Sequence, residues 1–215
     1  MDEIVLRSML KWPDVPSVYG WLRLDRRGNW LVRMPAAPDA GGLVKMPGGA
    51  NGAARFERIG NPAVVEFISR NYACDPDGRY YFQNGPQRVF VSLDRTPWVY
   101  RLDDAGRELT SHTGAPAGAP REAFFDEEGA LVLVCDPGAG VVLDRDLAAL
   151  AERFTDRVGR PLDPGALFER VRAGGAVEVR LMGAALTVGP IATETLAARF
   201  GFTMHPAPPP GEPDC

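Results

Sequence analysis

Hydrophobic residues alternate with polar ones in many short runs, and residues typical of turns separate these runs. Alternation with a period of two predicts β-strands that bury one face. Hydrophobic residues at helical spacing predict short helices near residues 2–10, 62–71, 145–154, 164–172 and 191–200. The sequence therefore predicts an α+β fold of antiparallel, hairpin-rich sheets with a few short helices. The expected strands lie near residues 19–24, 30–33, 80–83, 88–91, 98–100, 122–125, 130–134, 139–143, 176–181 and 184–188.

An Asp-x-x-Gly pattern recurs beside these expected strands. It occurs at residues 25–28, 75–78, 103–106 and 126–129. A type I turn favours Asp at its first position and Gly at its fourth, so each copy predicts a hairpin-like corner. The spacing is too irregular for a solenoid or propeller, and residues 75–78 lack the later positions of a calcium loop.

The segment around Asn84 and Pro86 predicts the register of one hairpin. Asn84-Gly85 is typical of a two-residue turn, but Pro86 would then lack the backbone N–H that closes it. A four-residue loop over residues 84–87 is therefore favoured. This register places Tyr80, Phe82, Val89 and Val91 on the core face, and Tyr81, Arg88 and Phe90 on the other.

Helix signals and breaks in the pattern divide the chain. Asn61 as N-cap, followed by Pro62, predicts a helix start. Proline and glycine crowd residues 34–55, which predict a long loop, and residues 113–121, which predict a boundary. We expect three parts: an N-terminal α+β subdomain over 1–115, a C-terminal α+β subdomain over 121–204, and a disordered tail over 205–215.

Charge and composition exclude several classes of protein. The 215 residues carry a net charge of −4, so no overall basic field favours nucleic acid. Residues 1–100 have 13 basic and 10 acidic side chains, net +3, whereas residues 101–215 have 11 and 18, net −7. The absence of a signal peptide and of a long apolar run predicts a cytoplasmic protein without membrane contact. Few lysines among many arginines, with abundant Gly, Pro and Ala, suggest a GC-rich bacterial genome.

No motif in the sequence specifies a reaction, and we expect no catalytic residues, metal or cofactor. His112 lies in a polar segment without a G-x-S-x-G elbow. Cys74, Cys135 and Cys215 are too far apart for a zinc knuckle or a disulfide framework. The glycine-rich residues 48–52 lack the ending of a phosphate-binding loop. The sequence therefore favours a protein that is not an enzyme.

Polar residues around the hairpin form the best candidate ligand site. Amide side chains satisfy turn backbone in many proteins, and Arg88 could be a plain surface residue. The alternative is that they converge at one edge of the sheet, where Arg88 offers a fork for a carboxylate or phosphate and Tyr81 stacks beside it. The candidate ligand-binding residues are Asn71, Tyr81, Asn84, Gln87 and Arg88.

Several motifs resemble known families. The segments Trp12–Pro16, Tyr19–Trp21, Phe67–Tyr72, Phe82–Val89 and Thr96–Trp98 are similar to an uncharacterised beta-proteobacterial family, catalogued as a domain of unknown function. This resemblance covers about residues 1–150. Ile59–Pro62, Asp77–Tyr80, Gln87–Val89 and Thr96–Trp98 more loosely resemble a second uncharacterised proteobacterial family of two-part, β-rich proteins. The resemblances imply a bacterial cytoplasmic α+β protein and supply no activity.

Three functional hypotheses are consistent with these features. The first is a binding or regulatory protein that recognises a small anionic ligand or a protein partner. The second is an enzyme of undetected type, such as a hydrolase that uses Asp75, Asp77 and Asp94. The third is a structural subunit with Trp21, Trp30 and Trp98 at an interface, and a homodimer is left open.

Overall fold

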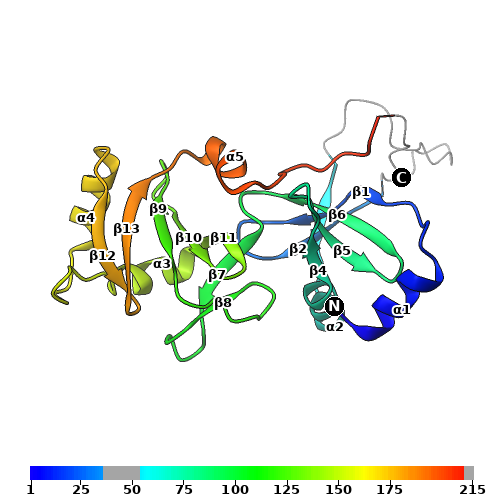
Figure 1. The fold of residues 1–215 in the computed structure, drawn as a ribbon, viewed down its shortest axis with the longest axis horizontal. Helices are drawn as coiled ribbons and strands as arrows, with labels where there is room; N and C mark the ends of the chain where they lie inside the picture. The colour runs from blue at the N-terminus through cyan, green and yellow to red at the C-terminus, as the bar shows by residue number, and fades with distance from the viewer. Residues whose placement is uncertain (36–53, 211–215) are drawn as a thin grey trace.

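Two β-sheets lie side by side along the length of the molecule (Figure 1). The computed structural model describes residues 1–35 and 54–210. The first sheet has six strands, and the second has seven. Within the described residues, short helices flank both sheets, so the α+β fold is confirmed.

The first sheet is built from residues 18–93. Helix α1 (Glu3–Lys11) precedes this sheet. Helix α2 (Pro62–Arg70) lies between the third and fourth strands of the sheet along the chain. In spatial order the strands are β3 (Phe56–Arg58), β2 (Trp30–Arg33), β1 (Val18–Leu24), β6 (Gln87–Leu93), β5 (Tyr80–Asn84) and β4 (Tyr72–Cys74).

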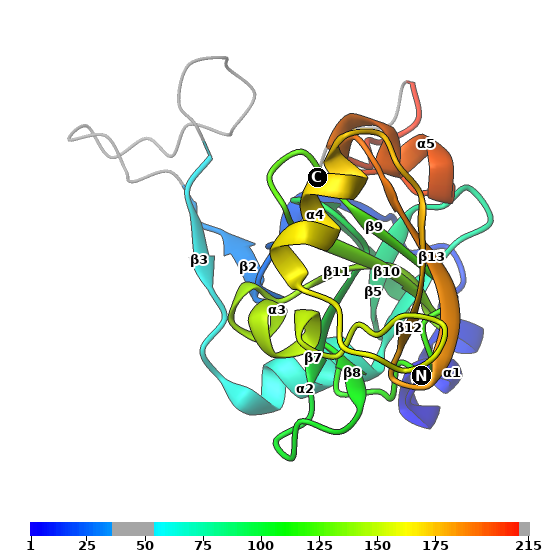
Figure 2. The ribbon, with the colours of Figure 1, turned by 90° about the vertical axis from the view of Figure 1, so that its left-hand side faces the viewer.

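The second sheet is built from residues 98–190. In spatial order its strands are β12 (Val177–Leu181), β13 (Ala184–Pro190), β9 (Glu122–Phe125), β10 (Leu131–Cys135), β11 (Gly138–Val142), β7 (Trp98–Leu102) and β8 (Leu109–Ser111). The accompanying helices are α3 (Asp144–Ala151), α4 (Pro164–Arg172), the 3₁₀ turn η1 (Thr193–Thr195) and α5 (Leu196–Phe200). Figure 2 looks onto this end of the molecule, with α4 in front of the strands.

Both sheets are mixed, which differs from the antiparallel sheets expected from sequence. The strand pairs β1–β6, β7–β11 and β9–β13 are parallel. Each of these pairs joins strands that are separated along the chain by other elements. Local turn signals report only hairpins between consecutive strands, so they contain no information about these pairings.

The four Asp-x-x-Gly corners are confirmed. In each, the Gly backbone N–H donates to the Asp carbonyl oxygen at 2.7–3.1 Å, and the Gly has a positive φ. The Asp carboxylate also accepts backbone N–H groups of the turn. A fifth corner, Asp156–Gly159, has the same geometry and was missed by the sequence analysis.

The β5–β6 hairpin has the predicted register but a tighter turn. Gln83 pairs with Arg88 as expected, and Asn84 also pairs with Gln87. The loop therefore contains only Gly85 and Pro86, not four residues. The Gly85 φ of +58° permits this turn, and Pro86 occupies its second position, so the chain does not need a proline N–H to close it.

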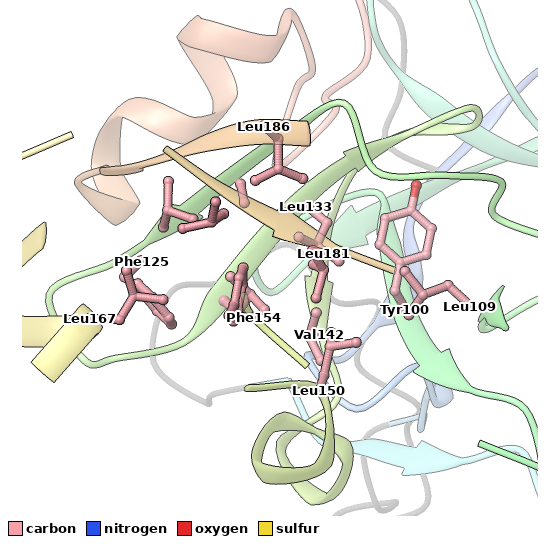
Figure 3. Packing of buried hydrophobic residues seen from close by; sticks show 14 of the residues in the cluster. Tyr100, Leu109, Phe125, Leu133, Val142, Leu150, Phe154, Leu167, Leu181 and Leu186 are labelled. Atoms are coloured by element: carbon pink, nitrogen blue, oxygen red, sulfur yellow. The ribbon is translucent and has the colours of Figure 1, made fainter. Parts of the chain in front are cut away.

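Two cores lie on opposite faces of the second sheet. Residues on one face pack against α3 and α4, and Figure 3 shows Phe125 beside Leu167 and Tyr100 beside Leu109 in this core. Residues on the other face, such as Phe124 and Val132, pack against the first sheet together with α2 and α5. A smaller cluster of Tyr19, Tyr81 and Phe90 lies on the far face of the first sheet, as the hairpin register predicts.

The C-terminal segment ties the second half back to the first sheet. After α5 the chain returns to the first sheet, where Leu93 N–H donates to the Met204 carbonyl and Thr203 N–H donates to the Gly78 carbonyl. Pro206 is buried, so the described start of the expected tail packs on the protein. Residues 211–215, and most of the expected 34–55 loop, lie outside the described residues.

The division into domains stays a prediction. Strands β7 and β8 precede the expected boundary at residues 113–121, yet they belong to the second sheet. The change from the first sheet to the second falls between Leu93 and Trp98.

Candidate functional site

A cleft of about 790 Å³ opens where the two edges of the second sheet approach each other. It lies between the turn after β7, the loop before β9, the residues after α3, and the β12–β13 hairpin turn. Strands β8 and β12 are the two outer strands of this sheet, and both contribute to the lining. The sheet is therefore curved enough to bring its two edges to one cleft.

The cleft exists because the edge strand β12 is only partly covered. The chain after α3 meets β12 in a single antiparallel bridge, in which Thr155 and Arg180 exchange two backbone hydrogen bonds of 2.8 and 3.0 Å. Before the bridge the chain comes from the end of α3 and does not pair with the Met182 end of β12, and Arg153 and Met182 line the cleft on this side. Space remains beside the bridge, and the cleft occupies it.

Three arginines line this cleft without a carboxylate partner. Arg107, Arg153 and Arg180 contribute to the lining, and no carboxylate oxygen of the described residues lies within 4.0 Å of their guanidinium groups. Arg180 Nη2 donates to the Gly183 carbonyl at 3.1 Å, which orients it along the hairpin turn. Arginines with unused donors in a concave surface are suited to carboxylate or phosphate recognition.

The local charge of the cleft is opposite to that of the surrounding half of the chain. The only acidic side chain among its described lining residues is Glu108, so three arginines and one glutamate give a net charge of +2. The nearby Asp103 carboxylate already accepts hydrogen bonds from the backbone of Arg107 and Glu108. Hydrogen bonds from the backbone N–H groups of Glu108 and Arg107, with smaller contributions from the Arg107 and Arg153 charges, hold the pKa of Asp103 below its usual value.

A strained residue forms part of the apolar floor. Met182 has a φ of +50°, and among the described residues it is the only one other than glycine with a positive φ. It precedes Gly183 in the two-residue β12–β13 turn, where Asn or Gly is usual. A side chain there costs about 1–2 kcal/mol. Met182 also packs partly against the core, so its thioether joins the core to the cleft beside Leu109.

Asn71, the first of the sequence-predicted site residues, is buried and has several hydrogen-bond partners. Its Oδ1 accepts from the Asp2 backbone N–H at 2.8 Å, and its Nδ2 donates to the Phe67 carbonyl at 2.9 Å. Asn71 therefore joins the start of α1 to the end of α2.

The other four predicted residues belong to the β5–β6 hairpin. Tyr81 and Arg88 come together as expected, with the guanidinium carbon 4.8 Å from the ring centroid. The Tyr81 side chain is buried, so its ring is largely shielded from solvent. Asn84 is exposed beside the turn, and Gln87 Nε2 donates to the Pro16 carbonyl at 3.1 Å. Their role in ligand binding stays a prediction.

The candidate catalytic side chains serve the fold. Asp75 closes its turn and pairs with Arg79 at 2.8 Å, while Asp94 pairs with Arg23. Burial raises the pKa of the Cys135 thiol to about 12 and also raises that of Cys74. Neither thiol is therefore a thiolate near neutral pH, so neither is suited to act as a nucleophile.

An aromatic junction joins the two sheets. Trp30 and Tyr72 from the first sheet meet Trp98 and His112 from the second, with ring centroids 5.1–5.7 Å apart. His112 Nδ1 accepts from the Val99 backbone N–H at 3.3 Å, while its buried Nε2 has no hydrogen-bond partner among the described residues and lies among aromatic rings. Burial, with a smaller contribution from Arg101, lowers the pKa of His112 to about 3. Trp30 is buried here and is not on an exposed interface.

The described residues contain neither a metal-binding cluster nor a membrane-spanning helix. Within residues 1–35 and 54–210, no three His, Cys, Asp or Glu side chains form a group that could hold a metal ion. No helix in the described part of the chain has the length and apolar character needed to span a bilayer.

Sequence reasoning missed the cleft because its parts are far apart along the chain. Arg107, Arg153 and Arg180 come from three segments, and each appears in the sequence as an ordinary polar residue near a turn. The one local signal is Met182-Gly183 between two expected strands, since a methionine in a two-residue hairpin turn is unusual. That signal indicates a special position but not an anion site.

These observations define an α+β protein of two mixed sheets with an arginine-lined cleft at the edge of the second sheet. A family model described as "Protein of unknown function (DUF2946)" matches residues 1–207, and the chain belongs to this family. Membership in a family of unknown function is thereby confirmed.

Neither the solved structures nor the curated proteins indicate an activity for this chain. The crystal structure of a DUF1285 family protein from Silicibacter pomeroyi DSS-3 is similar, with 16% sequence identity and a TM-score of 0.44. The similarity covers 80% of this chain and 82% of that chain. No curated protein matches.

Proposed function

We propose that this protein is a non-catalytic binding or regulatory protein that recognises a small organic anion in the cleft of the second sheet. The observation that supports this most strongly is the set of three arginines around one concave surface, none of which has an ion-pair partner among the described residues. A carboxylate or phosphate would supply the partners that these side chains lack. Such charge-assisted hydrogen bonds are worth about 1.5–3 kcal/mol each.

The chemistry of the cleft favours binding over catalysis. Arginine stays protonated and does not act as a general base. Glu108 and Thr155 are the described lining residues with a carboxylate or hydroxyl group, and no histidine or cysteine joins them there. Leu109 and Met182 provide apolar surface for the body of a ligand whose anionic group meets the arginines.

The setting of the protein is part of the same proposal. We infer a bacterial, beta-proteobacterial origin and a cytoplasmic location from the arginine-rich composition and the family resemblance described above. A cytoplasmic anion such as a phosphate monoester or a di- or tricarboxylate would be available there.

Isothermal titration of the full chain with inorganic phosphate, citrate and a simple phosphate monoester tests the proposal. We expect at least one anion to bind in the micromolar to millimolar range, with affinity that falls as salt increases. Arg153→Gln and Arg180→Gln should each weaken binding about 10- to 100-fold, because each loses one charge-assisted contact.

A matched control is Arg172→Gln on α4, whose guanidinium is exposed and pairs only loosely with Glu169 at 3.7 Å. It should leave binding unchanged. The proposal is wrong if no anion binds, or if Arg172→Gln weakens binding as much as the cleft variants do.

A further inference from the structure

Helix α1 exposes most of its large apolar side chains. Leu10 is 87% exposed and Ile4 is 74% exposed, and Leu6 also faces solvent. Met1 and Trp12 extend this surface at the two ends of the helix. Among the described residues, five of the eight exposed large hydrophobic side chains therefore lie within residues 1–12. Apolar surface concentrated in this way marks an interaction site.

The opposite side of α1 holds the helix on the protein. Val5 is the buried residue of the helix. The Asp2 carboxylate pairs with Arg70 at 3.2 Å, and the Asp2 backbone N–H donates to Asn71 Oδ1. These contacts fix the start of α1 against the end of α2, so the apolar side chains are held outward on a positioned helix.

The charges of α1 change sign along its length. Glu3 lies in the first turn and pairs with Arg7 of the same helix at 2.5 Å, whereas Lys11 lies in the last turn. The Glu3 side chain is 77% exposed, so it can also accept a contact from a second chain. In an antiparallel pair of identical helices, the acidic start of each helix lies beside the basic end of the other. In a two-fold arrangement the same contact between an acidic and a basic end is therefore made twice, as in any isologous interface.

We propose that the exposed face of α1 binds α1 of a second copy of this chain, antiparallel and around a two-fold axis. Leu6 of each copy packs against Leu10 of the other, and Glu3 of each lies near Lys11 of the other. A membrane surface is a poorer match, because α1 carries one acidic and two basic side chains, and a net charge of +1 gives little attraction to anionic lipid.

The dimer should be weak. A standard interface involves about 20–30 residues from each partner, and α1 provides far fewer. We expect a dissociation constant of about 10 µM or weaker. In Figure 1, α1 lies at the end of the molecule away from the second sheet. Dimerisation therefore leaves the cleft free, and this inference is independent of the proposed anion binding.

Sedimentation equilibrium of the full chain, from about 5 to about 500 µM, tests this inference. The protein should shift from monomer to dimer over this range, and Leu10→Asp should weaken the dimer at least about 10-fold by placing a charge in the apolar contact. The control is Val158→Asp, since Val158 is 74% exposed but lies in the second half, and it should leave the equilibrium unchanged.

Charge reversal distinguishes the antiparallel pairing from general stickiness. Glu3→Lys and Lys11→Glu should each weaken the dimer, and the double variant should restore it. Circular dichroism melting checks that each variant folds. A chain that stays monomeric at the highest concentration overturns the inference. A dimer that resists Leu10→Asp, or a double variant that does not recover, overturns it as well.

Discussion

The two sheets share a strand arrangement but differ in how its outer strand is covered. In each, the first strand of an Asp-x-x-Gly hairpin (β1 or β9) pairs in parallel with the last strand of a later hairpin (β6 or β13). In the first sheet, β4 covers the edge of β5 through three residue pairs. In the second, the Thr155–Arg180 bridge is the only backbone pairing at the edge of β12 within residues 1–35 and 54–210.

This difference explains where the cleft is found. In the first sheet the chain passes from β4 through the corner at residues 75–78 directly into β5, so three of the five β5 residues pair with β4. In the second sheet the segment before the corresponding corner at residues 156–159 pairs with β12 at Thr155 alone among the described residues, and Arg153 and Met182 line the cleft there. Unpaired space next to an edge strand is then available to a ligand. The same arrangement can thus close an edge or leave it open, depending on how much of the segment before the corner pairs as a strand.

The largest difference in stability is expected between two arginines that pair with corner aspartates, one buried and one exposed. Arg95 and Asp126 are both almost completely buried, and Arg95 also donates to Thr193 Oγ1 at 2.6 Å. Arg95→Gln leaves the Asp126 charge buried without its partner and should lower the free energy of unfolding by about 3–5 kcal/mol. Urea denaturation measures this.

The control for that substitution is Arg160→Gln, at the fifth corner. Arg160 pairs with Asp156 at 2.7 Å but is 79% exposed. Its loss should cost at most about 0.5 kcal/mol, because exposed ion pairs contribute little. Arg95 thus connects the β9–β10 corner of the second sheet with η1, through Asp126 and Thr193. Equal costs at the two positions would contradict the view that this connection stabilises the protein.

Glycines at equivalent corners should differ in the same way. A Cβ at Gly78 would lie 2.1 Å from the Gly201 carbonyl oxygen, whereas one at Gly159 would meet nothing within 4 Å. Both have a positive φ, which alone costs about 1–2 kcal/mol in an alanine variant. We therefore expect Gly78→Ala to cost about 3 kcal/mol and Gly159→Ala about 1 kcal/mol.

Thermal melting of the two glycine variants measures the difference. The C-terminal segment is the reason for it, since Gly78 also accepts a hydrogen bond from Thr203. If Gly159→Ala is the more damaging substitution, then the return of the C-terminal segment to the first sheet does not stabilise the protein.

The aromatic junction between the sheets should make stability depend on pH. The folded protein holds His112 neutral down to a pKa of about 3, while the unfolded chain binds a proton near pH 6.5. Stability is therefore lost as pH falls below about 6.5, and the loss is complete near pH 3. Between pH 7 and pH 4.5 we expect a decrease of about 2 kcal/mol from this one group.

Denaturation of His112→Gln across the same pH range checks that assignment. Its stability should change less with pH than that of the unsubstituted protein, whatever its absolute value. His205→Gln provides the control, because His205 itself is exposed, and it should keep the full pH dependence. An unchanged slope in His112→Gln would show that another group is responsible.

The smallest expected change in stability is at Met182, where one substitution separates the backbone strain of the turn from the role of the side chain in anion binding. Met182→Asn places a favoured residue in the β12–β13 turn but removes the thioether from the cleft floor. The gain at the turn and the lost packing are each about 1 kcal/mol, so stability should change by less than that. Anion affinity should nevertheless fall several-fold. Unchanged affinity would assign Met182 to the core alone.

Local structure was predictable from sequence where a single segment determines it. The Asn61-Pro62 start of α2 and the Asp-x-x-Gly corners depend on hydrogen bonds within a few residues, and both were confirmed. The face of the β5–β6 hairpin that carries Tyr81 was also confirmed, because register follows from spacing.

Features that depend on distant segments were not predictable. The short strands β3, β4 and β8 have three residues each, too few to show a period, and the parallel pairs join segments far apart along the chain. The buried amide of Asn71 serves α1, which begins 68 residues earlier. The cleft is the extreme case, because none of its arginines has a distinctive neighbour in the sequence.

Hydrogen–deuterium exchange of the full chain, with and without the anion that binds most tightly, compares the two sheets directly. Ligand contact slows exchange in the segments that it orders. We predict protection at residues 107–109, 153–155 and 180–183, and no change at residues 71–88 of the first sheet. Protection confined to residues 71–88 would contradict the assignment of the anion site to the open edge of the second sheet.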